Sequence, residues 1–293
     1  MSELLQRKVK GIFSDEIEED GRKLILAARE GRITFITGLL STNMVDINKL
    51  SYIRWEEESE KEEYYTTPLF AAARNGHTDI VRLLLDKGAK PNIPDEYDNS
   101  PLKTAAENGH KEVVKLLIDS GADPNMFDNF KHTALHDAAR NGHNDVIQML
   151  LDIGADPNIS KKGGETPLHE AAREGNFDTV QLFLDIGADP NITNGFRQTP
   201  LDLAFENEHN SVEDLLLENG ARPNKDYFEQ KLLSAINEGN AKDVKSLLLS
   251  GVHINFGDSE PLWEAVWSGH KNIVVLLLSK GANPNHHIDH GYA

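Results

Sequence analysis

The chain has 293 residues, enough for about two ordinary globular domains with a substantial core. Its 48 acidic residues outnumber its 30 basic residues, and the resulting net charge of −18 disfavours binding to nucleic acid or to an anionic membrane. Cysteine is absent, so disulfides, thiolate metal sites and a cysteine nucleophile are excluded. The N-terminus lacks the apolar segment of a secretory signal, and no apolar run approaches the roughly 20 residues of a membrane helix. We therefore expect a cytoplasmic protein, with the nucleus left open as a second compartment.

A 33-residue period runs along most of the chain. One marker is the asparagine that ends phrases such as GADPN, at Asn92, Asn125, Asn158, Asn191 and Asn224. A second marker is the hydroxyl residue that opens phrases such as TPLH, at Thr67, Ser100, Thr133, Thr166 and Thr199. A fixed period of this length predicts a stack of equivalent units, each in contact with its neighbours, in place of separate globular cores.

Each unit has the sequence signals of two short helices. In the best-defined unit, Thr67 can cap a helix through its hydroxyl, and Pro68 suits the first helical position because it has no N–H to leave unpaired. Gly76 supplies a left-handed residue that ends this helix. Apolar residues between 80 and 85 then recur at helical spacing. A lone helix pair cannot bury that apolar face, so stacking of neighbouring units is expected.

The unit resembles the ankyrin repeat, which has the same length and a T-P-L-H-x-A signature. The resemblance covers about residues 20 to 285 and implies an all-α solenoid of stacked helix-turn-helix units with protruding β-hairpin loops. We expect eight units, numbered one to eight below, at about 20–48, 64–92, 97–125, 130–158, 163–191, 196–224, 229–255 and 259–285.

Two irregularities lie near the start of the chain. Residues 1–19 precede the repeats as an N-terminal extension. The spacing from Asn48 to Asn92 exceeds the regular period by 11 residues, which places an acidic insertion at 49–63. Because residues 56–63 read EEESEKEE, we expect a mobile loop there.

A third irregularity predicts a break in the regular stacking between units six and seven, which we call the seam. Phe205 and Glu208 occupy positions where other units have alanine and glycine, and unit seven lacks the TPL phrase. Repeats one to six would then fill residues 20–224, while repeats seven and eight, with a short C-terminal tail, would fill 225–293. Two interpretations remain open: a continuous stack with one degenerate repeat, or a bend at residues 225–230.

Catalytic chemistry has no sequence signal here. The histidines mostly recur at two repeat positions, after the turn or within TPLH, where hydrogen bonding between neighbouring turns accounts for them. No phosphate-binding glycine loop, G-x-S-x-G phrase or H-E-x-x-H motif occurs. We expect neither an enzyme nor a bound cofactor or metal ion.

A row of aromatic residues marks the predicted hairpin tips. Three positions before the helix-capping hydroxyl stand Tyr64, Tyr97, Phe130 and Phe196, with Gly163 as the exception. Rings at solvent-facing tips would suit partner anchoring. The alternative is that each ring folds back onto the neighbouring hairpin as local packing.

A second candidate surface is the concave side of the stack. Asp137, Arg140, Glu170 and Arg173, which we call the charged floor, would lie on adjacent first helices. The alternative is a solvated charged face without a binding role. Trp267 falls in the same row of the last unit, four residues after Trp263, and this pair would either bind a partner or cap the stack.

The resemblance implies a function in noncovalent binding of a partner protein or peptide, in the manner of a scaffold or adaptor. A different possibility is the substrate-recognition module of a ubiquitin ligase or of a pathogen effector. Because the net charge is −18 and the acidic insertion, Asp137 and Glu170 would place negative potential beside the concave side, we expect a basic partner. We also expect a monomeric protein. The resemblance also implies hydroxylation of hairpin asparagines, for which Asn158 and Asn191 match best; each follows a proline where an aliphatic residue is more usual.

Overall fold

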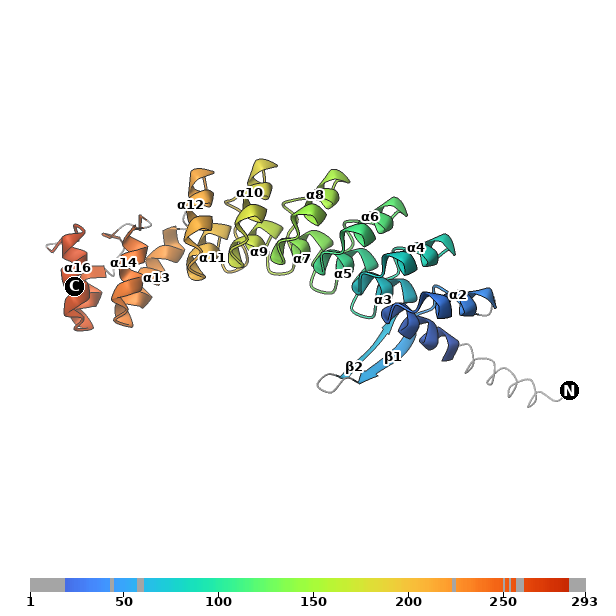
Figure 1. The fold of residues 1–293 in the computed structure, drawn as a ribbon. Helices are drawn as coiled ribbons and strands as arrows, with labels where there is room; N and C mark the ends of the chain where they lie inside the picture. The colour runs from blue at the N-terminus through green and yellow to red at the C-terminus, as the bar shows by residue number, and fades with distance from the viewer. Residues whose placement is uncertain are drawn as a thin grey trace, which may run out of the picture.

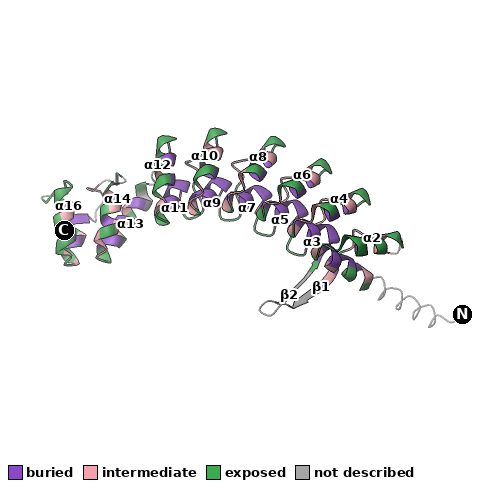
Figure 2. Ribbon diagram, viewed as in Figure 1, coloured by how far each residue is buried: buried purple, intermediate pink, exposed green. Residues whose placement is uncertain are grey.

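The protein folds as a curved stack of helix pairs (Figure 1). A computed structural model describes residues 19–42, 45–56, 61–222, 225–249, 251–252, 254–256 and 261–284. The first helices of the central units line the concave side, and the second helices form the convex side. Buried residues lie between the two rows, while the outer surfaces of the convex helices are exposed (Figure 2).

Each helix pair corresponds to one repeat unit. Unit one consists of a helix at 19–29 and α2 (Ile33–Ser41). In units two to six the first helices are α3 (Pro68–Arg74), α5 (Pro101–Glu107), α7 (Ala134–Arg140), α9 (Pro167–Arg173) and α11 (Pro200–Glu206). Their second helices are α4 (Thr78–Asp86), α6 (Lys111–Asp119), α8 (Asn144–Asp152), α10 (Phe177–Asp185) and α12 (Asn210–Glu218). The last pairs are α13 (Lys225–Asn237) with α14 (Ala241–Leu249), and α15 (Pro261–Trp267) with α16 (Lys271–Ser279).

The predicted helix signals act as expected. The Thr67 hydroxyl accepts a hydrogen bond from the Phe70 N–H at 3.2 Å, and Pro68 is the first residue of α3. Gly76 has φ +71°, a left-handed conformation that costs glycine little. Together these residues explain where α3 begins and ends.

Stacking buries the predicted apolar faces. Ile80, Val81 and Leu84 on α4 are buried, and so is the alanine pair Ala72 and Ala73 on α3. The small alanine side chains allow adjacent first helices to pack closely, which is why α3, α5, α7, α9 and α11 form a continuous row. The core is therefore a ribbon along the stack and not a central sphere.

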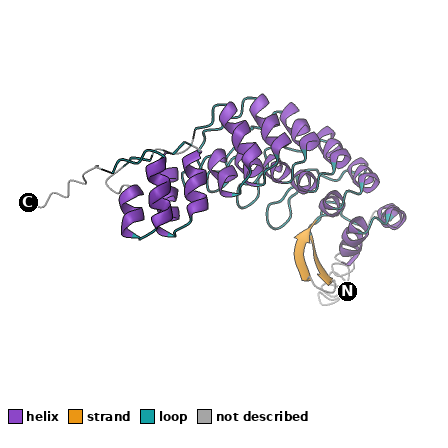
Figure 3. Ribbon diagram, turned by 60° about the vertical axis from the view of Figure 1, so that its left-hand side comes forward, coloured by secondary structure: helices purple, strands orange, loops and turns teal. Residues whose placement is uncertain are grey.

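The acidic insertion is largely a β-hairpin, which corrects the expectation of a mobile loop. Strands β1 (Ser51–Glu56) and β2 (Lys61–Thr66) pair antiparallel, with Ser51 opposite Thr66, and project from the stack next to α3 (Figures 1 and 3). Ile53 is buried in the core, and the Tyr52 and Tyr65 rings lie 5.3 Å apart across the strands. The β-forming residues that flank the acidic run outweigh its charge. Residues 57–60 of the run lie outside the described residues.

The packing changes between units six and seven. One buried cluster runs from the helix at 19–29 to Ala221, and a second begins at Phe228 and continues to Ala282. The Phe205 ring packs against Phe228, with ring centres 5.2 Å apart, so this bulky residue fills the junction where other units use alanine. Beside it lies a cleft of about 340 Å³ lined by residues of α11 to α14.

A regular bond between units is replaced at this junction. In each of units two to six, the side chain that follows the turn forms a hydrogen bond to a backbone carbonyl of the preceding unit. His110 Nε2, for example, lies 3.1 Å from Arg74 O. At the same position in unit seven, Asn240 accepts a hydrogen bond from the Asp243 N–H and so caps its own helix, α14. In the regular units the side chain after the turn lies close to a glycine of the preceding unit, as His110 does to Gly76. Glu208 of unit six occupies this glycine position.

Candidate functional site

Three of the four aromatic tip residues present their rings to solvent. The exposed fractions are 55% for Tyr97, 63% for Phe130 and 79% for Phe196. Tyr64 lies in β2, and its backbone is paired with Ile53, but its side chain is outside the described residues. The alternative, in which each ring folds away as local packing, would require much lower exposure than these values.

The tips are held in place by short side chains beneath them. The Asp128 carboxylate accepts hydrogen bonds from the backbone N–H groups of Phe130 and His132, at 2.8 and 2.9 Å. Asp95 does the same for Tyr97, and Asn194 for Phe196. These closed turns fix the backbone at each ring, so the rings need not be ordered when a partner binds.

Neighbouring tips are also linked to each other. The Asn129 N–H donates to the Tyr97 carbonyl at 3.4 Å, and the Lys162 N–H donates to the Phe130 carbonyl at 2.8 Å. The Gly195 N–H donates to the Gly163 carbonyl at 2.6 Å. Residues 96–98, 129–131, 162–164 and 195–197 therefore form a continuous hydrogen-bonded row, which we call the tip ridge.

The fifth unit lacks a tip ring for a backbone reason. Gly163 has φ +102°, and Gly164 after it has φ +84°. A Cβ on Gly164 would lie 3.1 Å from the Gly195 nitrogen of the next tip. A Cβ on Gly163 would meet no neighbouring atom of the described residues, but an aromatic residue there would be strained by the positive φ, so the gap in the aromatic row follows from the backbone conformation.

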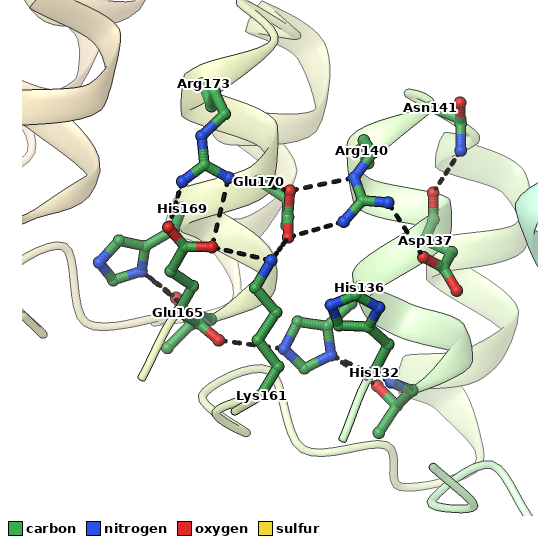
Figure 4. Close-up of polar contacts among 12 residues, drawn as sticks. His132, His136, Asp137, Arg140, Asn141, Lys161, Glu165, His169, Glu170 and Arg173 are labelled. Carbon is green, nitrogen blue, oxygen red and sulfur yellow. Dashed lines mark hydrogen bonds and ion pairs between the residues drawn. The ribbon is translucent and has the colours of Figure 1, made fainter. Parts of the chain in front are cut away.

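The charged floor forms a network of ion pairs around buried carboxylates (Figure 4). Arg140 forms two hydrogen bonds to the Glu170 carboxylate, Nε to Oε2 at 3.1 Å and Nη2 to Oε1 at 3.0 Å. Lys161 reaches the same carboxylate from the hairpin before α9, and Arg173 Nη1 lies 3.3 Å from Glu170 Oε2. Three cations from two units thus surround one buried acid.

Further ion pairs complete the network, and Arg140 joins them to Glu170 through its contact with Asp137. Lys103 Nζ lies 2.9 Å from Asp137 and 3.2 Å from Asp128. Glu165 pairs with Arg173, and its Oε2 lies 2.8 Å from Lys161 Nζ. The network joins four cations to four carboxylates, Lys103, Arg140, Lys161 and Arg173 with Asp128, Asp137, Glu165 and Glu170. Its formal charges cancel.

These pairs hold the acids in the charged form. Burial alone would raise the pKa of Glu170, but hydrogen bonds from Arg140 and Lys161 outweigh it and lower that pKa to about 2. The pKa of Glu165 is likewise lowered to about 2, against its burial, by hydrogen bonds from Arg173 and Lys161. Both groups are stable carboxylates near neutral pH, which favours a structural role over proton transfer.

The floor therefore differs from the surface that the sequence suggested. Asp137 and Glu170 are buried and paired, so the expectation that they contact a partner is corrected. Arg140 and Arg173 remain partly exposed, although both are engaged by these acids. Pattern reasoning missed Lys161, whose position holds an aspartate or asparagine in units three, four and six; that change of charge was a usable signal.

The expectation of structural roles for the periodic histidines is confirmed. His136 and His169 cap their own helices, and their Nε2 atoms bond the carbonyls of Glu165 and Gln198 in the next hairpins, at 3.2 and 3.1 Å. Burial lowers the pKa of both imidazoles to about 4, so they are neutral near pH 7. Among the described residues no cluster of histidine and carboxylate side chains could hold a metal ion.

The remaining candidates lie apart from the ridge. Trp267 is 76% exposed on α15, and its ring stacks on Trp263 with centres 5.2 Å apart. Asn158 accepts a hydrogen bond from the Asp189 N–H at 3.1 Å. Asn191 donates to the Gly220 carbonyl and accepts from the Arg222 N–H. Both asparagines thus tie one unit to the next, and their modification stays a prediction.

The comparison with protein families agrees with this architecture. A model described as ankyrin repeats (3 copies) matches residues 24–128, 98–161 and 135–227, and an ankyrin repeat model matches 260–289. These matches cover well over half of the chain, which therefore belongs to the ankyrin-repeat family. Ankyrin repeats are generally protein–protein interaction modules. A search of the curated proteins finds no match. None of the helices described here is long and apolar enough to cross a membrane.

Proposed function

We propose that this protein is a non-enzymatic adaptor that binds a partner protein or peptide through its tip ridge. The observation that carries the proposal is the exposure of Tyr97, Phe130 and Phe196 on tips whose backbone is already fixed. Large exposed rings weaken solubility and add little to folding, whereas aromatic anchors dominate the energy of many interfaces. Fixing them before binding reduces the entropy that association costs.

The test is affinity purification with mass spectrometry on the wild type and on a Tyr97→Ala/Phe130→Ala variant. Proteins captured by the wild type should be lost from the variant. A Phe177→Ala variant is the matched control, because Phe177 is 42% exposed but lies on α10, at the convex side. Capture that survives the tip substitutions as fully as it survives Phe177→Ala would refute the proposal.

Assembly state and compartment are further proposals. We propose a monomer in the cytoplasm or nucleus, and sedimentation velocity together with fractionation of cells would test both. The alternative role in a ubiquitin ligase or a pathogen effector gains no separate support from the described residues. The sequence led us to expect a basic partner. Asp137 and Glu170 do not support that expectation through direct contacts, because both are buried in ion pairs.

A further inference from the structure

The charge of the tip ridge differs from the charge of the molecule. Lys131, Lys162 and Arg197 are exposed on three consecutive tips, directly beside Phe130, Gly163 and Phe196. No ion pair is found for Lys131 or Lys162 among the described residues, although the chain as a whole carries −18. Basic side chains therefore lie on three of the four tips of the ridge, and on two of these they stand beside an aromatic residue.

The acids closest in sequence to Lys131 and Lys162 are already paired with other cations. Asp128 and Glu165, each three residues away, are buried, and both belong to the ion-pair network in which four cations balance four carboxylates. Pairing within a network leaves little field outside it, whereas exposed cations act on a partner over about 10 Å at 0.1 M salt. Lys131 and Lys162 therefore each present an exposed positive charge at their tip, and Arg197 adds an exposed guanidinium at the next tip.

The remaining tip of the ridge has the opposite charge. Glu96 and Asp98 flank Tyr97, and both are exposed. A ligand that follows the ridge thus meets acids at the Tyr97 tip and then bases from Lys131 to Arg197. This asymmetry specifies both the charge of a ligand and the direction in which it lies.

We infer that the tips from Phe130 to Arg197 bind an acidic peptide segment that also carries apolar side chains. This inference rests on the proposed function and names its partner class. Carboxylates of the segment would pair with Lys131, Lys162 and Arg197, and its apolar side chains would pack on Phe130 and Phe196. The rigid tip backbone would present both kinds of contact at fixed spacing.

Single-stranded nucleic acid is the competing ligand for exposed rings beside cations. Two observations favour the peptide. The net charge of −18 repels a polyanion over its whole length, whereas a short acidic segment meets only the local field. The acids at the Tyr97 tip interrupt the basic row after three tips.

The experiment selects random linear peptides displayed on phage against the wild-type chain, then measures selected synthetic peptides by fluorescence anisotropy. A polyuridine oligonucleotide is the second probe. The test variant is Lys131→Glu/Lys162→Glu/Arg197→Glu. The matched control, Arg82→Glu/Lys115→Glu/Lys245→Glu, changes the net charge equally at exposed positions of the convex helices α4, α6 and α14.

We expect the selected peptides to be acidic. Their affinity should be at least about tenfold weaker for the tip variant than for the wild type, and should change by less than about threefold for the control variant. Selection of basic peptides, equal effects of the two variants, or failure to select any peptide would overturn the inference. Tighter binding of polyuridine than of peptide at the same tips would also overturn it.

A Phe130→Ala/Phe196→Ala variant separates the two claims. If selected peptides bind this variant as they bind the wild type, the proposed function of the ridge fails. If the variant loses binding but the peptides are not acidic, only the inference about the partner's charge fails. Circular dichroism of every variant would show that the helices are retained.

Discussion

At the scale of single residues, Glu208 is the clearest departure from the repeat. It adopts φ +59° at a position where the other units place glycine. The left-handed conformation costs a residue with a side chain about 1–2 kcal/mol, which replacement by glycine would recover. Glycine also has more conformational freedom in the unfolded chain, and this offsets about 0.5–1 kcal/mol of the recovered stability. The Glu208–Lys242 ion pair is exposed on both sides and contributes little.

We predict that Glu208→Gly stabilises the protein by about 0.5–1 kcal/mol, read as a higher urea midpoint by circular dichroism. The matched control is Gly175→Ala, which should destabilise. Gly175 has φ +72°, and a Cβ there would lie 2.5 Å from His209 Nδ1. A lower midpoint for Glu208→Gly would show that its side chain has a role the repeat pattern does not reveal.

Leucines of the second helices test the register of the stack. Leu117 on α6 is fully buried, so Leu117→Ala should cost about 2–5 kcal/mol in free energy of unfolding, through lost burial and a residual cavity. Leu217→Ala on α12 is the control, because Leu217 is 41% exposed. A loss below about 1 kcal/mol at Leu117 in urea unfolding would contradict the packing described.

At the scale of elements, the helix starts of α7 and α9 make stability depend on pH. His136 and His169 have a pKa of about 4 in the folded chain, below the ordinary value of 6.5. Between these values the unfolded chain binds more protons, so the free energy of unfolding falls as the pH falls from about 6.5 to about 4. Glu165 and Glu170 act in the same direction, between about 4.5 and about 2.

We predict that each of these two histidines contributes at most about 1.4 kcal/mol per pH unit to that fall. A His136→Gln/His169→Gln variant should be less stable at pH 7, because two helix caps and two contacts between units are weakened. Its stability should nevertheless change less between pH 6.5 and 4, as measured by urea unfolding at several pH values. An unchanged pH slope in the double variant would refute the assignment.

At the scale of the whole molecule, the seam divides the stack into two buried clusters. The packing between them rests on the Phe205–Phe228 contact and on ion pairs such as Lys231–Glu206, beside an open cleft. Solenoid units stabilise one another through their interfaces, so a weak interface separates unfolding into steps. We therefore propose that α13 to α16 form a stack that opens independently at residues 225–230.

Tryptophan fluorescence can test this proposal. Trp263 and Trp267 both lie in the last unit, so in a Trp55→Phe variant all tryptophan emission comes from that unit. We predict that fluorescence will report unfolding at a lower urea concentration than circular dichroism, which follows the helices of the whole chain. Coincident transitions would instead show one continuous cooperative stack. Limited proteolysis near residues 224–228 would give an independent measure of the same opening.

The repeat pattern in the sequence determined much of this molecule. Helix starts such as Thr67, helix ends such as Gly76 and the buried face around Leu84 follow from local spacing, because caps and helix periodicity act within a few residues. The periodic histidines were predictable for a different reason: each occupies a repeat position, so the neighbouring unit offers its ring an equivalent backbone carbonyl every time. The exposure of Phe130 followed from its place at a turn that every unit repeats.

Tertiary structure decided what distant residues do to each other. Glu170 is read from sequence as a surface acid, yet Arg140 from the preceding unit and Lys161 from a hairpin enclose it and lower its pKa. Phe205 is read as a disruption, yet Phe228 from the next helix pair covers it. Such outcomes depend on which units lie beside each other and how their side chains meet, because burial and pairing of charges are set by contacts in space and not by local sequence.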